Sequence, residues 1–178
     1  MAKSNLVPNE IVPEVELFLN GKSLGVKKKE PDTYHVFWRV PFEAGTLKAV
    51  SRKNGSVVLT KEITTAGAAA KIILTADRNK IKANGEDLSF ITAKIVDDRG
   101  NMVPDADNLI EFEVKGDASI VGVDNGNPTS MESFKDNKRK AFNGLALAII
   151  KAAEKAGKVT STAKAQGLPP QTIEIEVK

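Results

Sequence analysis

Apolar residues alternate with polar ones along most of this chain, and residues that favour turns interrupt the alternation at short intervals. Residues 15–19 form the first such run, and Asn20-Gly21 follows at once, a pair that suits a tight hairpin turn. A period of two places successive side chains on opposite faces of a strand. We therefore predict five strands within residues 1–66, which include 15–19, 36–40, 47–51 and 57–63.

A run of small, uncharged residues without alternation, Ala66 to Ala70, separates this first part from the rest. We predict a domain boundary there, with domains at 1–66 and 67–178. The second domain has seven strand-like segments, namely 72–75, 88–96, 109–114, 118–123, 142–151, 158–165 and 172–177. Seven strands over about 110 residues are typical of an immunoglobulin-like sandwich. The predicted fold class is all-β, with two tandem immunoglobulin-like β-sandwiches, the first of them smaller and truncated.

One of these segments has the composition of a helix. Residues 139–157 are rich in Ala, Leu, Lys and Glu, which favour helices, and residues 145–150 are apolar at every position. A fully buried strand and a buried helix share such a run. We predict a strand, because the family resemblance described below places one there and the sandwich otherwise lacks its seventh strand.

A long polar segment, residues 122–144, interrupts the second domain between two apolar runs. A loop of this length inside a compact domain is usually functional or disordered. Its composition argues against disorder, because Phe134 and Phe142 can anchor it to a core and Pro128 stiffens it. Three roles remain open for its polar side chains: contact with a sugar, with a neighbouring domain, or with one another. The candidate residues are Asp124, Asn125, Asn127, Glu132, Lys135, Arg139 and Asn143.

These segments resemble those of a known family. The 122–144 loop and the strand after it resemble part of a carboxy-terminal immunoglobulin-like module of family 2 glycoside hydrolases of the β-galactosidase type. Val15 to Gly25 is similar to the hairpin of the module that precedes it in those enzymes. Thr65-Ala66-Gly67 and Ala76-Asp77-Arg78 are similar to the junction and the first strand end that follow. The resemblance extends from about Val15 to Val177.

The chain departs from the family pattern at two places. Related modules carry a further strand before the one at Val15, whereas Lys3 to Pro13 contains two prolines and makes a poor central strand. We therefore expect the first sandwich to be truncated, with an edge that a preceding domain covers. Within the long loop, Met131 stands where we would expect related modules to carry histidine, which weakens the idea of one shared chemical task for the loop.

The resemblance implies an accessory role. Family 2 enzymes cleave glycosidic bonds in a separate (β/α)8 barrel, amino-terminal to these modules, with two glutamates. Such a barrel needs roughly 250 residues of alternating strand and helix, and this chain has 178. We expect a non-catalytic accessory region that braces the barrel and preceding domains of a β-galactosidase-type parent and lends loops to its rim. The alternatives are a carbohydrate-binding module and a bacterial surface adhesin-type immunoglobulin-like repeat.

Composition narrows the function classes further. The chain has no cysteine, which excludes disulfides, thiolate metal sites and a cysteine nucleophile. The two dense basic clusters, Lys27–Lys29 and Lys138–Lys140, lie beside turns, so we interpret them as solvated hairpin ends and expect no nucleic-acid partner. No stretch approaches the ~18 apolar residues of a membrane span. We expect no cofactor, and a periplasmic or secreted bacterial location with the signal elsewhere in the parent.

The acidic residues have structural explanations that compete with chemical ones. Three pairs, Glu14/Glu16, Glu111/Glu113 and Glu174/Glu176, could place two carboxylates on one strand face, as glycosidases require. They alternate with apolar residues, so we assign them to exposed strand faces. Oxygen ligands for calcium gather in one turn region, at Asp97, Asp98, Asn101, Asp105 and Asp107. This region lacks the spacing of an EF-hand loop, and turns use Asp and Asn for their own hydrogen bonds, so we predict no metal site.

Aromatic residues and the only histidine lie close together in the first domain. The cluster consists of Tyr34, His35, Phe37, Trp38 and Phe42. One histidine cannot form a zinc site without further ligands, so we assign it a structural or surface role. Trp38 shares a strand face with Val36 and Val40 and is most simply a core residue. Tyr34 and Trp38 are the candidates for an aromatic platform on which a sugar ring would stack.

Overall fold

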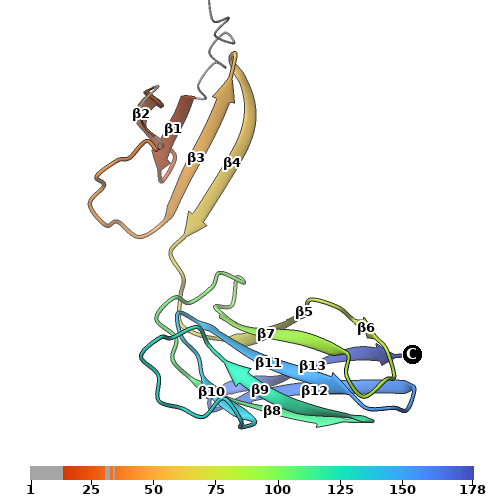
Figure 1. Ribbon diagram of the computed structural model, residues 1–178. Coiled ribbons are helices and arrows are strands. Elements are labelled where there is room, and N and C mark those ends of the chain that lie inside the picture. Colours follow the sequence, from red (N-terminus) through yellow and green to blue (C-terminus); the bar gives the residue numbers. More distant parts are fainter. Residues whose placement is uncertain (1–13, 31–32, 34) are drawn as a thin grey trace, which may run out of the picture. The chain divides into compact units, whose positions relative to one another are not determined.

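The computed structural model describes residues 14–30, 33 and 35–178. These residues separate into two compact units, with the division between Thr65 and Ala66 (Figure 1). All regular secondary structure among them is β-strand, which confirms the all-β prediction. The described residues contain no helix that could span a membrane.

The first unit is built on one antiparallel sheet with the strand order β2-β1-β3-β4. Its strands are β1 (Glu14–Leu19), β2 (Lys22–Lys28), β3 (Thr46–Lys53) and β4 (Ser56–Thr64). Both predicted Asn-Gly turns are present, and all four of their residues have positive φ angles, between 52° and 81°. Positive φ at both central positions matches the right-handed twist of the flanking strands, so the turns fix the register of both hairpins.

The predicted strand at 36–40 is wrong, and the described residues of the first unit hold four strands where the sequence predicted five. The expected alternation of exposure is present, with Trp38 and its i±2 neighbours half-buried and Phe37 exposed. However, the segment makes no strand ladder. The Lys27 ammonium donates a hydrogen bond of 2.7 Å to the Phe37 carbonyl, a position that a neighbouring strand would otherwise occupy. The prediction for Lys3 to Pro13 lies outside the described residues.

The second unit consists of two sheets that face each other across one core. One sheet has the order β5-β7-β11-β9 and the other β10-β8-β12-β13-β6. The strands are β5 (Lys71–Ala76), β6 (Lys80–Ile81), β7 (Leu88–Val96), β8 (Leu109–Lys115), β9 (Ala118–Asp124), β10 (Lys138–Lys140), β11 (Leu145–Ala152), β12 (Gly157–Ala165) and β13 (Leu168–Val177). All seven predicted strands are present, and the two additional ones, β6 and β10, are too short to leave a periodic signal.

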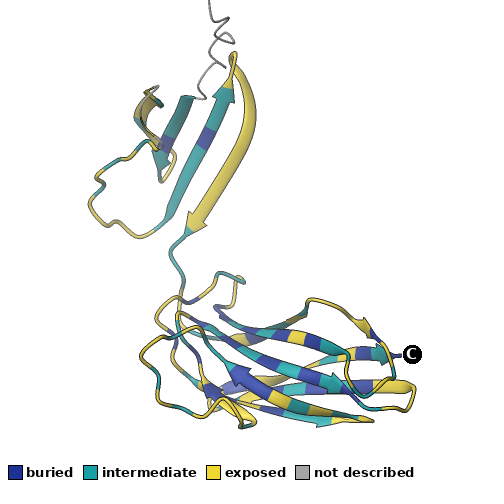
Figure 2. Cartoon of the chain, viewed as in Figure 1, coloured by how far each residue is buried: buried dark blue, intermediate teal, exposed yellow. Residues whose placement is uncertain are grey.

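The core of the second unit follows the period of two that the sequence shows. Ile91, Ala93 and Ile95 of β7 are fully buried, and they face Phe112 of β8 and Ile175 of β13 in one continuous apolar cluster. In Figure 2 the strands accordingly alternate between buried and more exposed residues. The segment that could have been a helix is strand β11, and its Ala146, Ala148 and Ile150 belong to this core. The strand prediction there is confirmed.

Gly144 closes the turn before β11 and lies tightly against a neighbouring segment. Its φ is +75°, and a Cβ atom built on it would meet the Val103 carbonyl oxygen at 2.4 Å. Gly167, in the turn between β12 and β13, has a similar φ of +79° but open space around it. Positive φ favours glycine at both positions, and the close contact with Val103 is a second reason at Gly144.

We expect Gly144→Ala to destabilise the second unit more than Gly167→Ala. Gly167→Ala loses roughly 1 kcal/mol to the left-handed backbone. Gly144→Ala loses this and a further ~1–3 kcal/mol, because the methyl group forces the Val103 backbone away. Urea denaturation followed by far-UV circular dichroism measures both losses. Tryptophan fluorescence would report on the first unit instead, because the single tryptophan lies there. Equal losses for the two variants would contradict the close contact.

Candidate functional site

The 122–144 loop is organised around a buried arginine. It leaves strand β9 at Asp124 and returns through β10, in which Arg139 lies opposite the core residue Ile110 of β8. The Arg139 side chain is completely buried. Its guanidinium donates hydrogen bonds to the Glu132 backbone carbonyl at 2.8 Å and to Asn125 Oδ1 at 3.1 Å. One side chain therefore ties the outgoing and returning halves of the loop together.

Two carboxylates and one aromatic ring complete the environment of Arg139. Asp124 Oδ1 and Glu132 Oε2 each lie 3.8 Å from guanidinium nitrogens. The Phe134 ring centroid lies 4.9 Å from the guanidinium carbon, a cation–π distance. Among the described atoms Nε has no hydrogen-bond partner. The buried charge is thus balanced by neighbouring carboxylates, as a charge withdrawn from water must be.

Two sequence expectations about this loop are corrected. Lys138 to Lys140 was expected to be a solvated hairpin end, but strand β10 alternates, so Arg139 points inward while its two lysine neighbours are exposed. Phe134 was expected to anchor the loop in the core, but 57% of it is exposed because it covers the guanidinium from outside. Phe142 is half-buried, as an anchor should be.

Five of the seven candidate loop residues converge in one network, and two lie outside it. Asn125 Nδ2 donates to the Lys140 carbonyl at 2.9 Å, and Asn125 Oδ1 accepts from the Asn127 amide at 3.0 Å. The Glu132 carboxylate accepts from the Lys140 amide at 3.3 Å. Asp124 and Arg139 complete the network. Lys135 is exposed, and Asn143 occupies the tight turn before β11 with a φ of 51°.

The outer surface of the loop is partly apolar. Met131 is 98% exposed, and Phe134 is the next large apolar side chain along the loop. The polar groups inside the loop bond mainly to one another, so the loop holds its shape without a ligand. Such a preformed loop presents its outer side chains at a fixed geometry.

The aromatic platform that the sequence suggested is only partly described. Tyr34 lies outside the described residues. Trp38 is half-buried, and the Lys27 ammonium lies 5.3 Å from its ring centroid and 5.2 Å from that of Phe37. The lysine therefore occupies a position over the ring that a stacking sugar would need. His35 is exposed, and its ring centroid lies 6.1 Å from that of Phe37.

Asp97, one of the calcium candidates, has a structural role. Its carboxylate accepts hydrogen bonds from the Gly67 amide at 2.9 Å and from the Asn101 amide and side chain at 2.7 and 3.0 Å. The Gly67 amide first, and then the Asn101 donors, lower the pKa of Asp97 to about 2. Asp97 thus fastens the start of the second unit to the turn after β7. Asp98, Asp105 and Asp107 are exposed.

The paired glutamates lie on strand surfaces among cations. Ser23, and then Arg52 at 2.9 Å, lower the pKa of Glu16. Lys164 lowers that of Glu113 in the same way. Lys178, followed by Lys80, lowers that of Glu176. Among the residues that the structure describes, no group of three or more acidic or histidine side chains could hold a metal ion.

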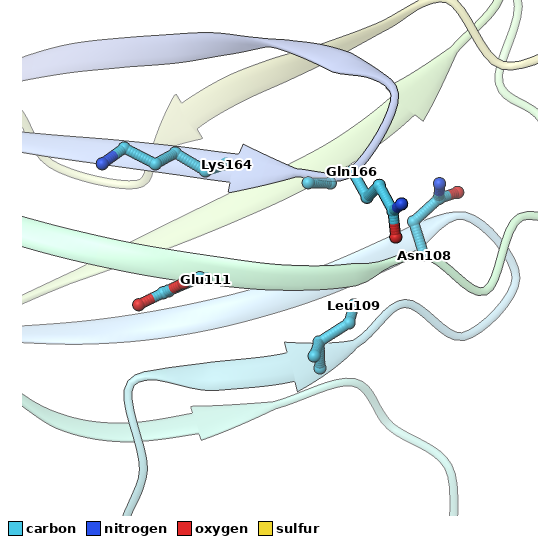
Figure 3. Close-up of a pocket in the computed structure, with 6 residues that line it drawn as sticks. Asn108, Leu109, Glu111, Lys164 and Gln166 are labelled. Atoms are coloured by element: carbon cyan, nitrogen blue, oxygen red, sulfur yellow. The ribbon is translucent and has the colours of Figure 1, made fainter.

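The second unit has a surface hollow of about 400 Å3 where β8 and β12 run side by side (Figure 3). Its lining consists of Asn108, Leu109, Glu111, Lys164, Ala165 and Gln166. The charged side chains in the lining are Glu111 and Lys164. Lys164 bonds to Glu113 on the neighbouring strand, so one of these two charges is already paired. The lining contains no aromatic ring on which a sugar could stack.

We expect Arg139→Met to destabilise the second unit by about 2–4 kcal/mol, because it leaves the Glu132 carbonyl and the Asn125 amide without their donor. The neighbouring Lys138→Met is the control and should change stability by less than ~0.5 kcal/mol, since Lys138 is exposed. Urea denaturation measures the loss, and amide hydrogen exchange over residues 125–137 should accelerate only in the Arg139 variant. Unchanged exchange there would show that the loop does not depend on the guanidinium.

We expect Asp97 to make the second unit acid-sensitive. Its pKa is about 2 in the folded state and about 3.9 in an unfolded chain. The stabilisation is therefore fully present above pH ~4 and is lost as the pH falls towards 2. Asp97→Asn should be less stable at neutral pH and should lose less stability between pH 4 and 2. Parallel pH profiles of the two proteins would exclude this role.

Each of the two units matches a family model. A model of the family described as glycoside hydrolase family 2 C-terminal domain 5 matches residues 72–174, and one described as a domain of unknown function (DUF4982) matches residues 11–59. A β-galactosidase of Bacteroides ovatus is 53% identical over 165 residues, which cover 93% of this chain and 19% of that protein.

Two solved structures are similar over nearly the whole chain. A glycosyl hydrolase family 2 member from Bacteroides cellulosilyticus has 43% identity and a TM-score of 0.87, over 93% of this chain and 21% of that one. A β-glycosidase from Bacteroides vulgatus has 30% identity and a TM-score of 0.87, over 96% of this chain and 23% of that one. The chain thus spans about a fifth of the length of these proteins. Because the first family model matches more than half of the 178 residues, the chain belongs to the glycoside hydrolase family 2 C-terminal domain 5 family.

Proposed function

We propose that this chain is a non-catalytic accessory region of a β-galactosidase-like glycoside hydrolase. The observation that carries the proposal is the family match, together with the small share of each relative that the chain covers. The glutamates support it, since Glu16, Glu113 and Glu176 have pKa values lowered by neighbouring groups. The general acid of a glycosidase requires the opposite shift.

The partners in this proposal are the catalytic barrel and the preceding domains of the parent chain, in a periplasmic or secreted enzyme. The accessory region braces them and offers the 122–144 loop to the rim of the active site. The network around Arg139 supports this role, because a loop held by its own hydrogen bonds contacts a partner with little loss of conformational entropy. Lys135 and Asn143, which lie outside the network, are the polar side chains left to meet a sugar or a domain.

The test compares the B. ovatus β-galactosidase with two derivatives. One lacks the region that this chain matches, and the other carries this chain in its place. We expect the deletion to lower the thermal unfolding temperature and the replacement to restore it, because the region covers surface of the remaining enzyme. The 178-residue chain alone should not hydrolyse β-galactosides. An unchanged unfolding temperature on deletion would argue against bracing, and hydrolysis by the purified chain would overturn the proposal.

A binding experiment on the 178-residue chain distinguishes the accessory role from the alternative of a carbohydrate-binding module. Calorimetric titration of the 178-residue chain with galactosides and polysaccharides should give no saturable binding, since the Lys27 ammonium lies over the Trp38 ring. Saturable binding that a folded Trp38→Ala variant loses would assign the chain to the carbohydrate-binding modules instead. Far-UV circular dichroism of the whole variant chain, compared with that of the unchanged chain, checks that the variant is folded.

A further inference from the structure

The two sheets of the second unit present different outer faces. On the β5-β7-β11-β9 sheet, the side chains of β11 that point away from the core are Leu145, Leu147 and Ile149. Their cross-strand neighbours include Phe90 of β7, opposite Ile149, and Ile73 of β5, in the row of Leu145. An antiparallel sheet with one solvated face normally alternates apolar and polar residues. Strand β11 instead carries apolar side chains on both faces from Leu145 to Ile150, and the polar Thr92 and Asp124 are the cross-strand neighbours of Leu147.

The opposite sheet has the outer face expected of a solvated one. Lys164 pairs with Glu113 across β12 and β8, and Lys158 pairs with Glu174 across β12 and β13 at 3.0 Å. The hydroxyls of Thr162 and Thr172 bond to each other at 2.8 Å. Because these charges and hydroxyls satisfy one another in water, this face needs no partner. Apolar outward side chains are therefore a property of the β5-β7-β11-β9 sheet and not of both sheets.

The apolar outer face continues into the long loop. A Cβ atom built on Gly122 of β9 would lie 3.5 Å from the Phe134 carbonyl oxygen and 3.6 Å from Ile149 Cδ1, so the loop and β11 meet above this glycine. Phe134 is 57% exposed and Phe90 37%. We define the β11 face as Ile73, Phe90, Val121, Phe134, Leu145, Leu147 and Ile149. These residues lie on β5, β7, β9 and β11 and on the loop segment whose Phe134 carbonyl accepts a hydrogen bond from the Val123 amide of β9, and the polar Thr92 and Asp124 lie next to Leu147 among them.

Two lysines lie in the first and last rows of the β11 face, with Lys94 between Ile73 and Leu145. Lys94 shares the row of Leu145, and Lys151 follows Ile149 along the same side of β11. Neither lysine forms an ion pair within the part of the chain that the structure describes. An apolar centre with charged ends is the usual anatomy of a protein interface, and cationic ends match a partner with acidic residues at its margin.

We propose that the β11 face is the surface on which the rest of the parent enzyme docks, through an apolar patch with carboxylates placed against Lys94 and Lys151. The inference rests on the proposed accessory function and names the surface that performs it. The occupant is part of the same polypeptide, because about four fifths of each relative lies outside the region that this chain matches. Covalent attachment gives that partner a high effective concentration, so a modest apolar face is sufficient.

Lysine footprinting tests the assignment. The 178-residue chain and the B. ovatus enzyme that carries it are treated with an amine-acetylating reagent, and mass spectrometry gives the rate at each lysine. In the enzyme, Lys94 and Lys151 should react at least roughly tenfold more slowly than in the isolated chain, since acetylation then requires the interface to open. Lys158 and Lys164, on the opposite sheet, should react at equal rates in both proteins.

Matched variants separate docking from a general change in the fold. Leu147→Lys places a charge at the centre of the β11 face and should abolish the protection of Lys94 and Lys151. Thr162→Lys places the same charge on the central strand of the opposite sheet and should leave the protection intact. Circular dichroism of both isolated chains checks that they are folded.

Three results would overturn the assignment. They are equal rates for Lys94 and Lys151 in the two proteins, protection of Lys158 and Lys164 in their place, and protection in the isolated chain that grows with its concentration, which would identify a second copy as the occupant. The accessory function has its own readouts, hydrolysis and unfolding temperature. Protection of Lys158 and Lys164 together with restored thermal stability would therefore refute the assignment of the docking surface and leave the accessory function standing.

Discussion

The guanidinium of Arg139 is the interaction on which the most distinctive part of this molecule depends. A charge removed from water is stable only when hydrogen bonds and opposite charges surround it. Here those partners, Asn125, Glu132 and Asp124, come from the far half of the same loop. Folding the loop is therefore the condition for burying the arginine, and burying the arginine fixes the loop. A chain without cysteine obtains a cross-link of this kind from electrostatics.

The sandwich and the loop divide the work between them. The core of the second unit uses small and β-branched residues such as Ala148, Ile150 and Ile175, which pack the two sheets closely together. Side-chain hydrogen bonds then tie irregular segments to this core, as Asp97 does at the start of the unit. The regular strands supply rigidity, and the irregular segments set the outer surface. The proposed docking face combines both, since it runs from β11 onto Phe134.

The sequence predicted strands well and the state of individual side chains less well. Period-two patterns and turn residues are local signals, and they indicated most of the long strands of the second unit, whereas β11 is apolar at every position from 145 to 150 and was predicted as a strand from the family resemblance. The segment at 36–40 shows where such signals end, because alternation reports which face is covered but not whether a neighbouring strand is available. Arg139 was among the candidate loop residues, but its burial was missed for a related reason. Its alternation with Lys138 and Lys140 indicates an inward position, but the residues that neutralise it lie up to 15 positions away and meet it only in the fold.

Strand β4 has a consequence for how this chain behaves outside a larger protein. It lies at the edge of the first sheet, and within the described residues it pairs only with β3. Val57, Val58, Leu59 and Ile63 are all more than half exposed along it. A long apolar edge strand with free backbone donors and acceptors is a template for intermolecular strand addition, and Lys61 and Glu62 are the only charges that oppose it. Aggregation of the separated region would therefore begin at this edge, so its solubility depends on what covers β4.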